Sequence, residues 1–526
     1  MDNEKVIVIG LDGATWSLLK KLITENITPN IKSIIEKGVY GILKSTIPPI
    51  TGPAWVSFAT GKNPGKHGCY DFLIPFKSLA ELHPISSTTI RTKTFYEILE
   101  EYGKNNILIN LPVSTPPKTK GIVIADFLTL SKQLWFPYEL VTEIPELKNY
   151  RLAPKGEWMV NRKIDKLIQD ILEIENTRFE IAYKLLIKKK WDFFFLLFSG
   201  TDWIQHVVYN QLISKGGPAL KIFIEIDKYI GKILNFVKRE KFNLLIISDH
   251  GFASYKRTFR INDWLEKEGF LRMKVDEVNF KYSNSHHLDR EMTKAKELGI
   301  NIKIPRFVLK LVDFFPLIPY VYFKLKTFLN FNIKKPSLVP QWQQTFAYCT
   351  ITGASNFSGI YINTYPRFKD GVVYSTNEYV KIKNSLIQKL KKLSFIDWAV
   401  DSKSIYWGHQ VPLAPDIILK ASNHVLDKTW NYPLKALRNE HHLDGIFMAY
   451  GHTFEQGKFL ENLSILDIAP TILHMFGIPI PQDMDGRVLK EVFKKNSKYA
   501  KQKIVYQSYE KERIKEKIKR IKNKKI

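Results

Sequence analysis

Several apolar segments of the sequence end in side chains that are good ligands for divalent cations. The clearest case is Asp249 and His250, which follow the apolar run 244–247 after a single serine. A carboxylate and an imidazole together suit zinc or manganese, and burying both at the tip of a strand costs free energy unless a cation compensates. We therefore interpret the pair as metal ligands, with a structural Asp–His hydrogen bond as the alternative.

A second pair, Asp202 and His206, follows the apolar run 193–197. If a helix begins near Gly200, the spacing of four residues puts both side chains on one face of that helix. Two ligands on one face can hold the same ion, so this pair is the second candidate. For His206 the alternative is an ordinary surface or core histidine.

Two further signals are weaker on their own. Asp12 lies on a glycine-flanked turn after the run 6–9, where an aspartate that caps the following helix would explain it equally well. His441 and His442 come just before the run 445–448, and one of them could close a metal site. Adjacent histidines also occur on loops that bind nothing.

The segment 48–61 carries several hydroxyl groups. Its prolines and glycine predict a rigid turn before a helix of small residues, which would hold the Thr51 hydroxyl beside helix-terminal N–H groups that suit an anion. Three other hydroxyls in or beside this segment are equally good candidates, namely Thr46, Ser57 and Thr60. By itself the segment is only a helix cap, so the sequence neither establishes an anion site nor selects one of the four hydroxyls.

These residues need a sheet to bring them together, because they are scattered along the chain. Short apolar runs bounded by turn residues and separated by helical periodicity predict a parallel sheet covered on both faces. The clearest runs are 6–9, 107–109, 122–124, 193–197, 244–247, 417–419 and 445–448. The predicted fold class is α/β, a doubly wound α/β/α sandwich with a mostly parallel sheet, in which ligands gather at the carboxyl ends of the strands.

The strand pattern is interrupted between residues 255 and 345, where the chain is lysine-rich and aromatic, and it resumes at 359–363. We expect a helical, aromatic insertion there, on a sheet assembled from both flanking sequences. The predicted division is a catalytic α/β domain of residues 1–254 and 346–490, an insertion or cap of residues 255–345, and a basic helical tail of residues 491–526.

Length and composition exclude several classes of protein. The chain has 526 residues, 44% of them hydrophobic and 25% charged, so it is neither a disordered chain nor a disulfide-stapled miniprotein. Two cysteines, Cys69 and Cys349, cannot form a disulfide framework, and the N-terminus lacks the basic head and long apolar middle of a secretory signal. No window has the roughly 18 uninterrupted apolar residues of a spanning helix. We therefore expect a cytoplasmic protein.

The net charge of +27, from 79 basic and 52 acidic residues, favours an anionic partner. A phosphorylated small-molecule substrate, a lipid-like substrate and peripheral contact with an anionic membrane all fit that charge. Nucleic acid fits it too, but the chain has neither zinc-finger spacing nor an RNP-type aromatic motif. We therefore do not expect nucleic acid to be the partner.

The order of the candidate residues resembles the alkaline phosphatase superfamily, in particular its type I phosphodiesterase/nucleotide pyrophosphatase-like branch with the predicted phosphohydrolases and phosphomutases of bacteria and archaea. The matching residues are, in chain order, Asp12, Thr51, Asp202, His206, Asp249, His250 and His441. The segments 463–471 and 484–487 also look like that family's C-terminal helix and closing loop. The resemblance thus covers nearly the whole chain.

The resemblance implies a nucleophilic Thr51 and two divalent cations, with zinc the first choice and manganese the second. One cation would be surrounded by Asp12, Thr51, Asp249 and His250, and the other by Asp202, His206 and His441. The family places its last ligand four residues before the glycine of the last strand. Because that glycine is Gly445 here, the resemblance favours His441 over His442.

The resemblance also implies an activity, that of a metal-dependent phosphoric-ester hydrolase of the phosphodiesterase type with a phosphothreonine intermediate. A phosphoryl or headgroup transferase, or a phosphomutase, of the same superfamily is the first alternative. A basic membrane- or nucleic-acid-binding protein with a vestigial site is the alternative from another class. Where the family's diesterases have Thr-Phe-Pro-Asn, this chain has Thr51-Gly52-Pro53-Ala54, so the amide that would hold phosphoryl oxygens is absent and the substrate class stays open.

Overall fold

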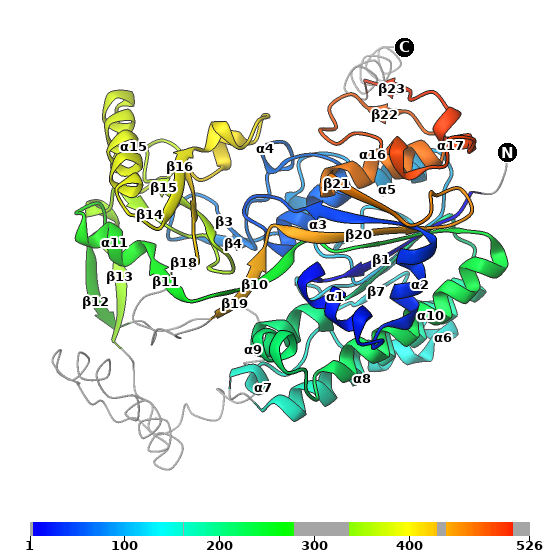
Figure 1. Ribbon diagram of the computed structural model, residues 1–526. Coiled ribbons are helices and arrows are strands. Elements are labelled where there is room, and N and C mark those ends of the chain that lie inside the picture. Colours follow the sequence, from blue (N-terminus) through cyan, green and yellow to red (C-terminus); the bar gives the residue numbers. More distant parts are fainter. Residues whose placement is uncertain (1–3, 161–162, 278–335, 429–437, 509–526) are drawn as a thin grey trace, which may run out of the picture.

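The computed structural model describes residues 4–160, 163–277, 336–428 and 438–508. Most of the expected insertion, residues 278–335, and the end of the expected tail, residues 509–526, lie outside these ranges, so the predictions made for them stay predictions. The described part forms a larger lobe around a nine-stranded sheet and a smaller lobe around a four-stranded sheet (Figure 1).

The nine-stranded sheet has the strand order β21-β2-β20-β9-β1-β8-β5-β6-β7. Its strands are β1 (Val6–Leu11), β2 (Val39–Lys44), β5 (Asn106–Ile109), β6 (Ile122–Ile124), β7 (Trp135–Phe136), β8 (Phe193–Phe198), β9 (Asn243–Ile247), β20 (Asp444–Tyr450) and β21 (Lys458–Ser464). The five neighbours from β9 to β6 pair in parallel, whereas β20 and β7 run antiparallel to the strands beside them. The sheet is therefore mostly parallel, as the sequence predicts.

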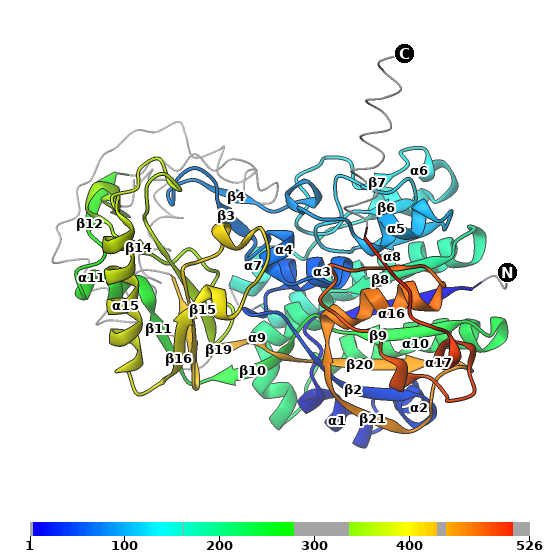
Figure 2. The same ribbon diagram turned by 90° about the horizontal axis from the view of Figure 1, so that it is seen from above.

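Helices cover both faces of this sheet (Figures 1 and 2). On one face lie α1 (Trp16–Thr24), α2 (Pro29–Lys37), α8 (Ile164–Lys188), α9 (Gly200–Ser214) and α10 (Leu220–Glu240), and on the other lie α3 (Thr51–Thr60), α5 (Phe95–Glu101) and α16 (Ile468–Met475). In β1, Ile7 and Ile9 enter the first core while Val6 and Val8 enter the second. Alternate side chains thus bury on opposite faces. The predicted doubly wound sandwich is confirmed.

The smaller lobe is built on an antiparallel sheet in the order β14-β15-β17-β16. Its elements are α11 (Ile261–Lys267), β14 (Ala347–Tyr348), β15 (Phe357–Ile362), α15 (Thr376–Lys391), β16 (Ile396–Asp401) and β17 (Ile417–Ala421). A short ladder of β10 (Gly251–Tyr255) with β19 (Arg438–His442) lies between the lobes in Figure 1. A second ladder, of β11 (Arg257–Arg260) with β18 (His424–Asp427), belongs to the smaller lobe, whose core contains Leu426 of β18.

The sheet membership expected for two runs is wrong. Residues 359–362 and 417–419 do form strand, but in β15 and β17 of the smaller lobe, which pair with each other. Trp264 and Leu265, from the described flank of the expected insertion, share a core with this sheet. An apolar run indicates a buried strand but not its partners.

Three strands of the large sheet, β2, β21 and the two-residue β7, were not predicted. β2 alternates buried and half-buried residues, and β21, at the edge of the sheet, exposes several of its residues. Neither therefore shows the continuous apolar run of a strand that is buried on both faces.

Other expectations concern the two cysteines, membrane-spanning helices and the C-terminal tail. Cys69 and Cys349 are buried and unpaired with each other. Among the helices of the described ranges, none is long and apolar enough to cross a membrane. Within 491–508, the tail contains the single-turn helix α17 (Lys498–Lys501) and the strand β23 (Tyr506–Gln507), so the helix predicted for the tail could lie only beyond the described residues.

Substitution of Phe195, in β8, tests the packing of the sheet against α3. It has no exposed surface, and its ring centroid lies 5.4 Å from those of Trp55 and Phe58. Because truncation leaves a cavity, we expect Phe195→Ala to lower the free energy of unfolding by about 3–5 kcal/mol, measured by chemical denaturation. Phe459→Ala, at a position that is 42% exposed, is the control and should cost less than about 1 kcal/mol. Equal losses in the two variants would contradict this packing.

Candidate active site

The acidic residues of the site lie at the carboxyl ends of three adjacent parallel strands. Asp12 follows β1 and Asp249 lies just beyond β9, while Asp202 is in the first turn of α9, just after β8. Because β9, β1 and β8 are neighbours in the sheet, their ends meet at one edge. α9 begins at Gly200, as expected, and it places Asp202 and His206 on one face.

The ladder of β10 with β19 brings the last histidine to this edge. Phe252 of β10 lies opposite His441, and the His250 and His441 rings stack with centroids 3.6 Å apart. His441 is 3% exposed, whereas the side chain of His442 is 41% exposed and lies against Asp444. Of the two adjacent histidines, His441 therefore faces the cluster.

Thr51 is the first residue of α3. Its Oγ1 lies 3.2 Å from Nε2 of His250. As residues of the first turn, Thr51 and Gly52 have N–H groups without an acceptor inside the helix, an arrangement that suits an anion. A Cβ at position 52 would lie 2.7 Å from Cδ1 of Ile85, so the phenylalanine of the family's diesterases would require the Ile85 side chain to move.

The other three hydroxyls of this segment are engaged elsewhere. Thr46 and Thr60 donate to main-chain carbonyls of their own segment, at 3.0 and 2.8 Å. Ser57 Oγ lies 2.9 Å from Nε2 of His67. Of the four candidates, Thr51 is the one in contact with the cluster of acidic and imidazole groups.

The metal-type side chains form two overlapping groups. One consists of Asp202, His206 and His441 and the other of Asp12, Asp202 and His250, and in each group the ligand atoms lie within 4.8 Å of one another. Asp202 Oδ1 lies 3.4 Å from His206 Nε2 and 3.5 Å from His441 Nε2. Nε2 of His250 lies 3.7 Å from Asp12 Oδ1 and 3.3 Å from Asp249 Oδ2. The structure thus brings together all seven residues selected from the sequence.

Hydrogen bonds fix the tautomer of all three imidazoles. Nδ1 lies 3.2 Å from the Asn439 carbonyl oxygen in His206, 3.0 Å from that of Gly251 in His250 and 2.9 Å from that of Pro49 in His441. A carbonyl oxygen only accepts, so each Nδ1 carries a proton, and each ring in its neutral form presents its Nε2 lone pair to the cluster. Nε2 atoms of His206 and His441 lie 3.1 Å apart. Lone pairs at that distance repel unless a proton or a cation lies between them.

Two carboxylates of the site, Asp12 and Asp249, also lack compensating charge. Burial, with Asp249 and Asp202 nearby, holds the pKa of Asp12 well above its usual range, and burial raises the pKa of Asp249 to about 7. Asp12 Oδ1, Asp202 Oδ1 and Asp249 Oδ2 are buried without a hydrogen-bond partner. Unpartnered carboxylate oxygens beside convergent Nε2 lone pairs form a donor set that fits zinc or manganese.

Three supporting residues were not predicted. Gln205 Nε2 donates to the Gly13 carbonyl at 2.9 Å, and Glu175 accepts from the first N–H of α9 at 2.6 Å. Glu440 Oε2 lies 3.3 Å from Nδ1 of His206. Gln205 and Glu440 are each next to an expected ligand in the sequence, which is the one signal that could have found them. Their partners are distant in the chain, so spacing does not reveal the contacts.

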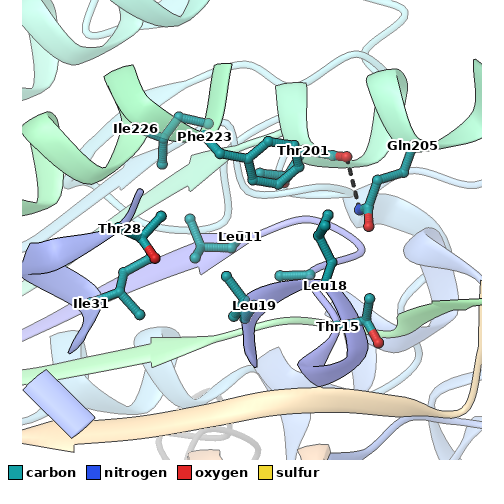
Figure 3. Close-up of a pocket in the computed structure, with 11 residues that line it drawn as sticks. Leu11, Thr15, Leu18, Leu19, Thr28, Ile31, Thr201, Gln205, Phe223 and Ile226 are labelled. Atoms are coloured by element: carbon teal, nitrogen blue, oxygen red, sulfur yellow. Dashed lines mark hydrogen bonds between the residues drawn. The ribbon is translucent and has the colours of Figure 1, made fainter. Parts of the chain in front are cut away.

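A small cavity of mostly apolar walls lies behind the turn that carries Asp12 (Figure 3). Leu11, Leu18 and Phe223 line it, together with Gln205, whose Nε2 donates to the Thr201 carbonyl at 2.9 Å. None of its lining residues titrates. The cavity therefore belongs to the core that supports the site and not to the site itself.

The doubly wound sandwich and the ligand cluster at the ends of β1, β8 and β9 define an alkaline-phosphatase-like protein. The chain belongs to the type I phosphodiesterase/nucleotide pyrophosphatase family, whose sequence model matches residues 6–305. It is thus a member of a family of metal-dependent phosphoester hydrolases. The model of the C-terminal region of N-sulphoglucosamine sulphohydrolase matches residues 432–525. No curated protein matches the sequence.

Two solved structures illustrate the similarity of fold. Phosphonoacetate hydrolase from Sinorhizobium meliloti 1021, in complex with phosphonoacetate, has a TM-score of 0.53 at 14% identity, over 89% of this chain and 94% of that one. Murine ectonucleotide pyrophosphatase/phosphodiesterase 5 has a TM-score of 0.53 at 13% identity, over 93% of this chain and 100% of that one. At these identities the likeness establishes the fold.

Zinc binding at this site should compete with protons. Because burial raises the pKa of Asp249 to about 7, the metal-free protein holds protons near neutral pH that a cation must displace. We expect zinc affinity to fall as the pH is lowered below about 7, with net release of protons. Calorimetry in two buffers of different ionisation enthalpy measures both quantities. An affinity that does not change with pH would contradict this assignment.

Proposed function

We propose that this chain hydrolyses phosphoric esters with Thr51 as the nucleophile and two divalent cations, zinc or manganese, as cofactors. One cation would bind Asp12, Thr51, Asp249 and His250, and the other Asp202, His206 and His441, with Asp202 close to both. The observation that carries the proposal is the 3.2 Å contact of Thr51 Oγ1 with His250 Nε2, inside a cluster of metal-type ligands. Bound there, the cations would favour the Thr51 alkoxide and offset the charge of the phosphoryl oxygens.

The proposed reaction has two steps, formation of a phosphothreonine at Thr51 and its hydrolysis. Thr51 Oγ1 forms a bond to phosphorus while the bond from phosphorus to the leaving oxygen breaks, which gives a phosphothreonine. Water then approaches from the side of Asp202, His206 and His441, breaks the new ester and restores the hydroxyl. The N–H groups of the first turn of α3 would hold the non-reacting phosphoryl oxygens, in place of the amide that is absent at Ala54.

The net charge of this chain and the ligands bound to two related proteins support the proposed chemistry of the substrate. The chain carries a net charge of +27, which attracts anionic esters. The Sinorhizobium hydrolase is bound to phosphonoacetate, and the murine protein, as an inactive threonine-to-alanine variant, is bound to AMP. Both ligands contain a phosphorus-centred anion. We infer that the substrate is a phosphorylated small molecule or a lipid-like phosphoric ester.

Thr51→Ala tests the nucleophile. Without the hydroxyl no phosphothreonine forms, so we expect turnover of a chromogenic phosphodiester or monoester to fall by at least about a thousandfold while bound zinc is retained. Thr60→Ala is the matched control, because the Thr60 hydroxyl is equally buried and bonds only a carbonyl within α3. It should retain activity. Full activity in Thr51→Ala, with zinc bound, would refute the assignment.

A product analysis separates hydrolysis from transfer. With an alcohol such as glycerol in the assay, hydrolysis predicts free phosphate or phosphomonoester in the same amount as the leaving group. Transfer to an acceptor predicts a phosphorylated alcohol as the main product. The second outcome would replace the hydrolase proposal with the transferase or phosphomutase alternative of the same superfamily.

A further inference from the structure

Glu440 lies between a candidate metal ligand and the smaller lobe. Its Oε2 is 3.3 Å from Nδ1 of His206, and its Oε1 accepts from Arg438 at 2.8 Å from Nε and 2.5 Å from Nη2. The residue is only 8% exposed. A buried carboxylate that shares its two oxygens between an imidazole and a guanidinium is held in one orientation, since both partners donate to it.

This contact fixes the direction of the His206 ring. Nδ1 faces two acceptors, the Glu440 carboxylate and the Asn439 carbonyl oxygen at 3.2 Å. The edge of the ring also packs against Phe252, with centroids 4.9 Å apart and planes at 78°. With one side of the ring held in this way, Nε2 points at Asp202 and His441, the other members of its group.

The two groups of ligands differ in the acceptors that hold the Nδ1 atoms of their imidazoles. Nδ1 of His250 and Nδ1 of His441 each lie against a main-chain carbonyl oxygen. Within the described ranges, His206 is the one imidazole of the cluster with a carboxylate at Nδ1. A carboxylate partner makes an imidazole a stronger ligand than a carbonyl does, because it stabilises positive charge on the ring. Only the group of Asp202, His206 and His441 has this feature.

Arg438 joins Glu440 to the smaller lobe. Its guanidinium pairs with Asp427 at the end of β18 and donates to the Gly353 carbonyl at 2.8 Å. Asp427 and Glu440 are 6% and 8% exposed, and the side chain of Arg438 between them is 21% exposed, so the chain of contacts from β18 to His206 is mostly buried. The position of His206 therefore depends on residues of the smaller lobe.

We propose that Glu440 is a positioning residue for His206, and that through Arg438 and Asp427 it makes cation binding at Asp202, His206 and His441 depend on the smaller lobe. This inference rests on the proposed function, because it assigns a cation to that group. Removing the charge of Glu440 should weaken one of the two cation sites and leave the other, around Asp12, Asp249 and His250, unchanged.

Zinc titration of the full chain, in competition with a chromophoric chelator, tests the proposal. Glu440→Gln keeps the shape of the side chain but removes its charge, and we expect one of two zinc ions to bind about 10–100-fold more weakly. The absorption of bound cobalt at that site should shift, a change that a purely structural role would not cause. Glu268→Gln is the control, since Glu268 is a carboxylate of the smaller lobe that pairs with Lys389. It should bind both ions as the unmodified protein does.

The outcomes separate the inference from the proposed function. If the unmodified chain binds two zinc ions and Glu440→Gln binds both with unchanged affinity, the positioning role is wrong and the hydrolase proposal stands. If the unmodified chain does not bind two ions, the proposed function itself fails. Should Glu440→Gln not fold, Glu440→Asp decides the question, because its shorter carboxylate withdraws from His206. It should weaken the same single site, and equal affinities there would overturn the proposal.

Discussion

One electrostatic constraint governs this protein, namely that three buried carboxylates and three imidazole lone pairs share a space that requires additional positive charge. Asp202 Oδ1 lies within 3.4 and 3.5 Å of two Nε2 atoms and has no hydrogen-bond partner. The rings cannot relieve this by changing tautomer, because each Nδ1 is bonded to a main-chain carbonyl. The two divalent cations of the proposed function would satisfy both kinds of ligand at once, and the surrounding elements hold the ligands in place.

The sheet supplies the rigid part of this arrangement. β9, β1 and β8 are adjacent and parallel, so three ligand-bearing turns meet without any long connection. Gly13 makes the close approach of two of them feasible: its φ is +63°, and a Cβ there would lie 3.1 Å from Asp202 Oδ1. Thr51 completes the site from α3, which packs on strand β8 through Trp55 and Phe58.

The smaller lobe contributes to the site through the ladder of β10 with β19. That ladder carries His441, and its register is supported by the bond from the His441 N–H to the Ala354 carbonyl at 2.8 Å. The contacts of Arg438 and Glu440 continue the same support to His206. The smaller lobe is thus part of the framework of the ligand cluster.

Local patterns in the sequence determined a large part of this structure. The run 244–247 and its neighbours predict the central strands, because a strand buried on both faces must be apolar throughout, and the four-residue spacing of Asp202 and His206 predicts their shared helical face. Only the tertiary structure selected Thr51 among four hydroxyls, oriented His441 rather than His442, placed β15 and β17 in a second sheet, and brought Glu440 to His206. Those outcomes depend on contacts between residues far apart in the chain, and no local propensity encodes such contacts.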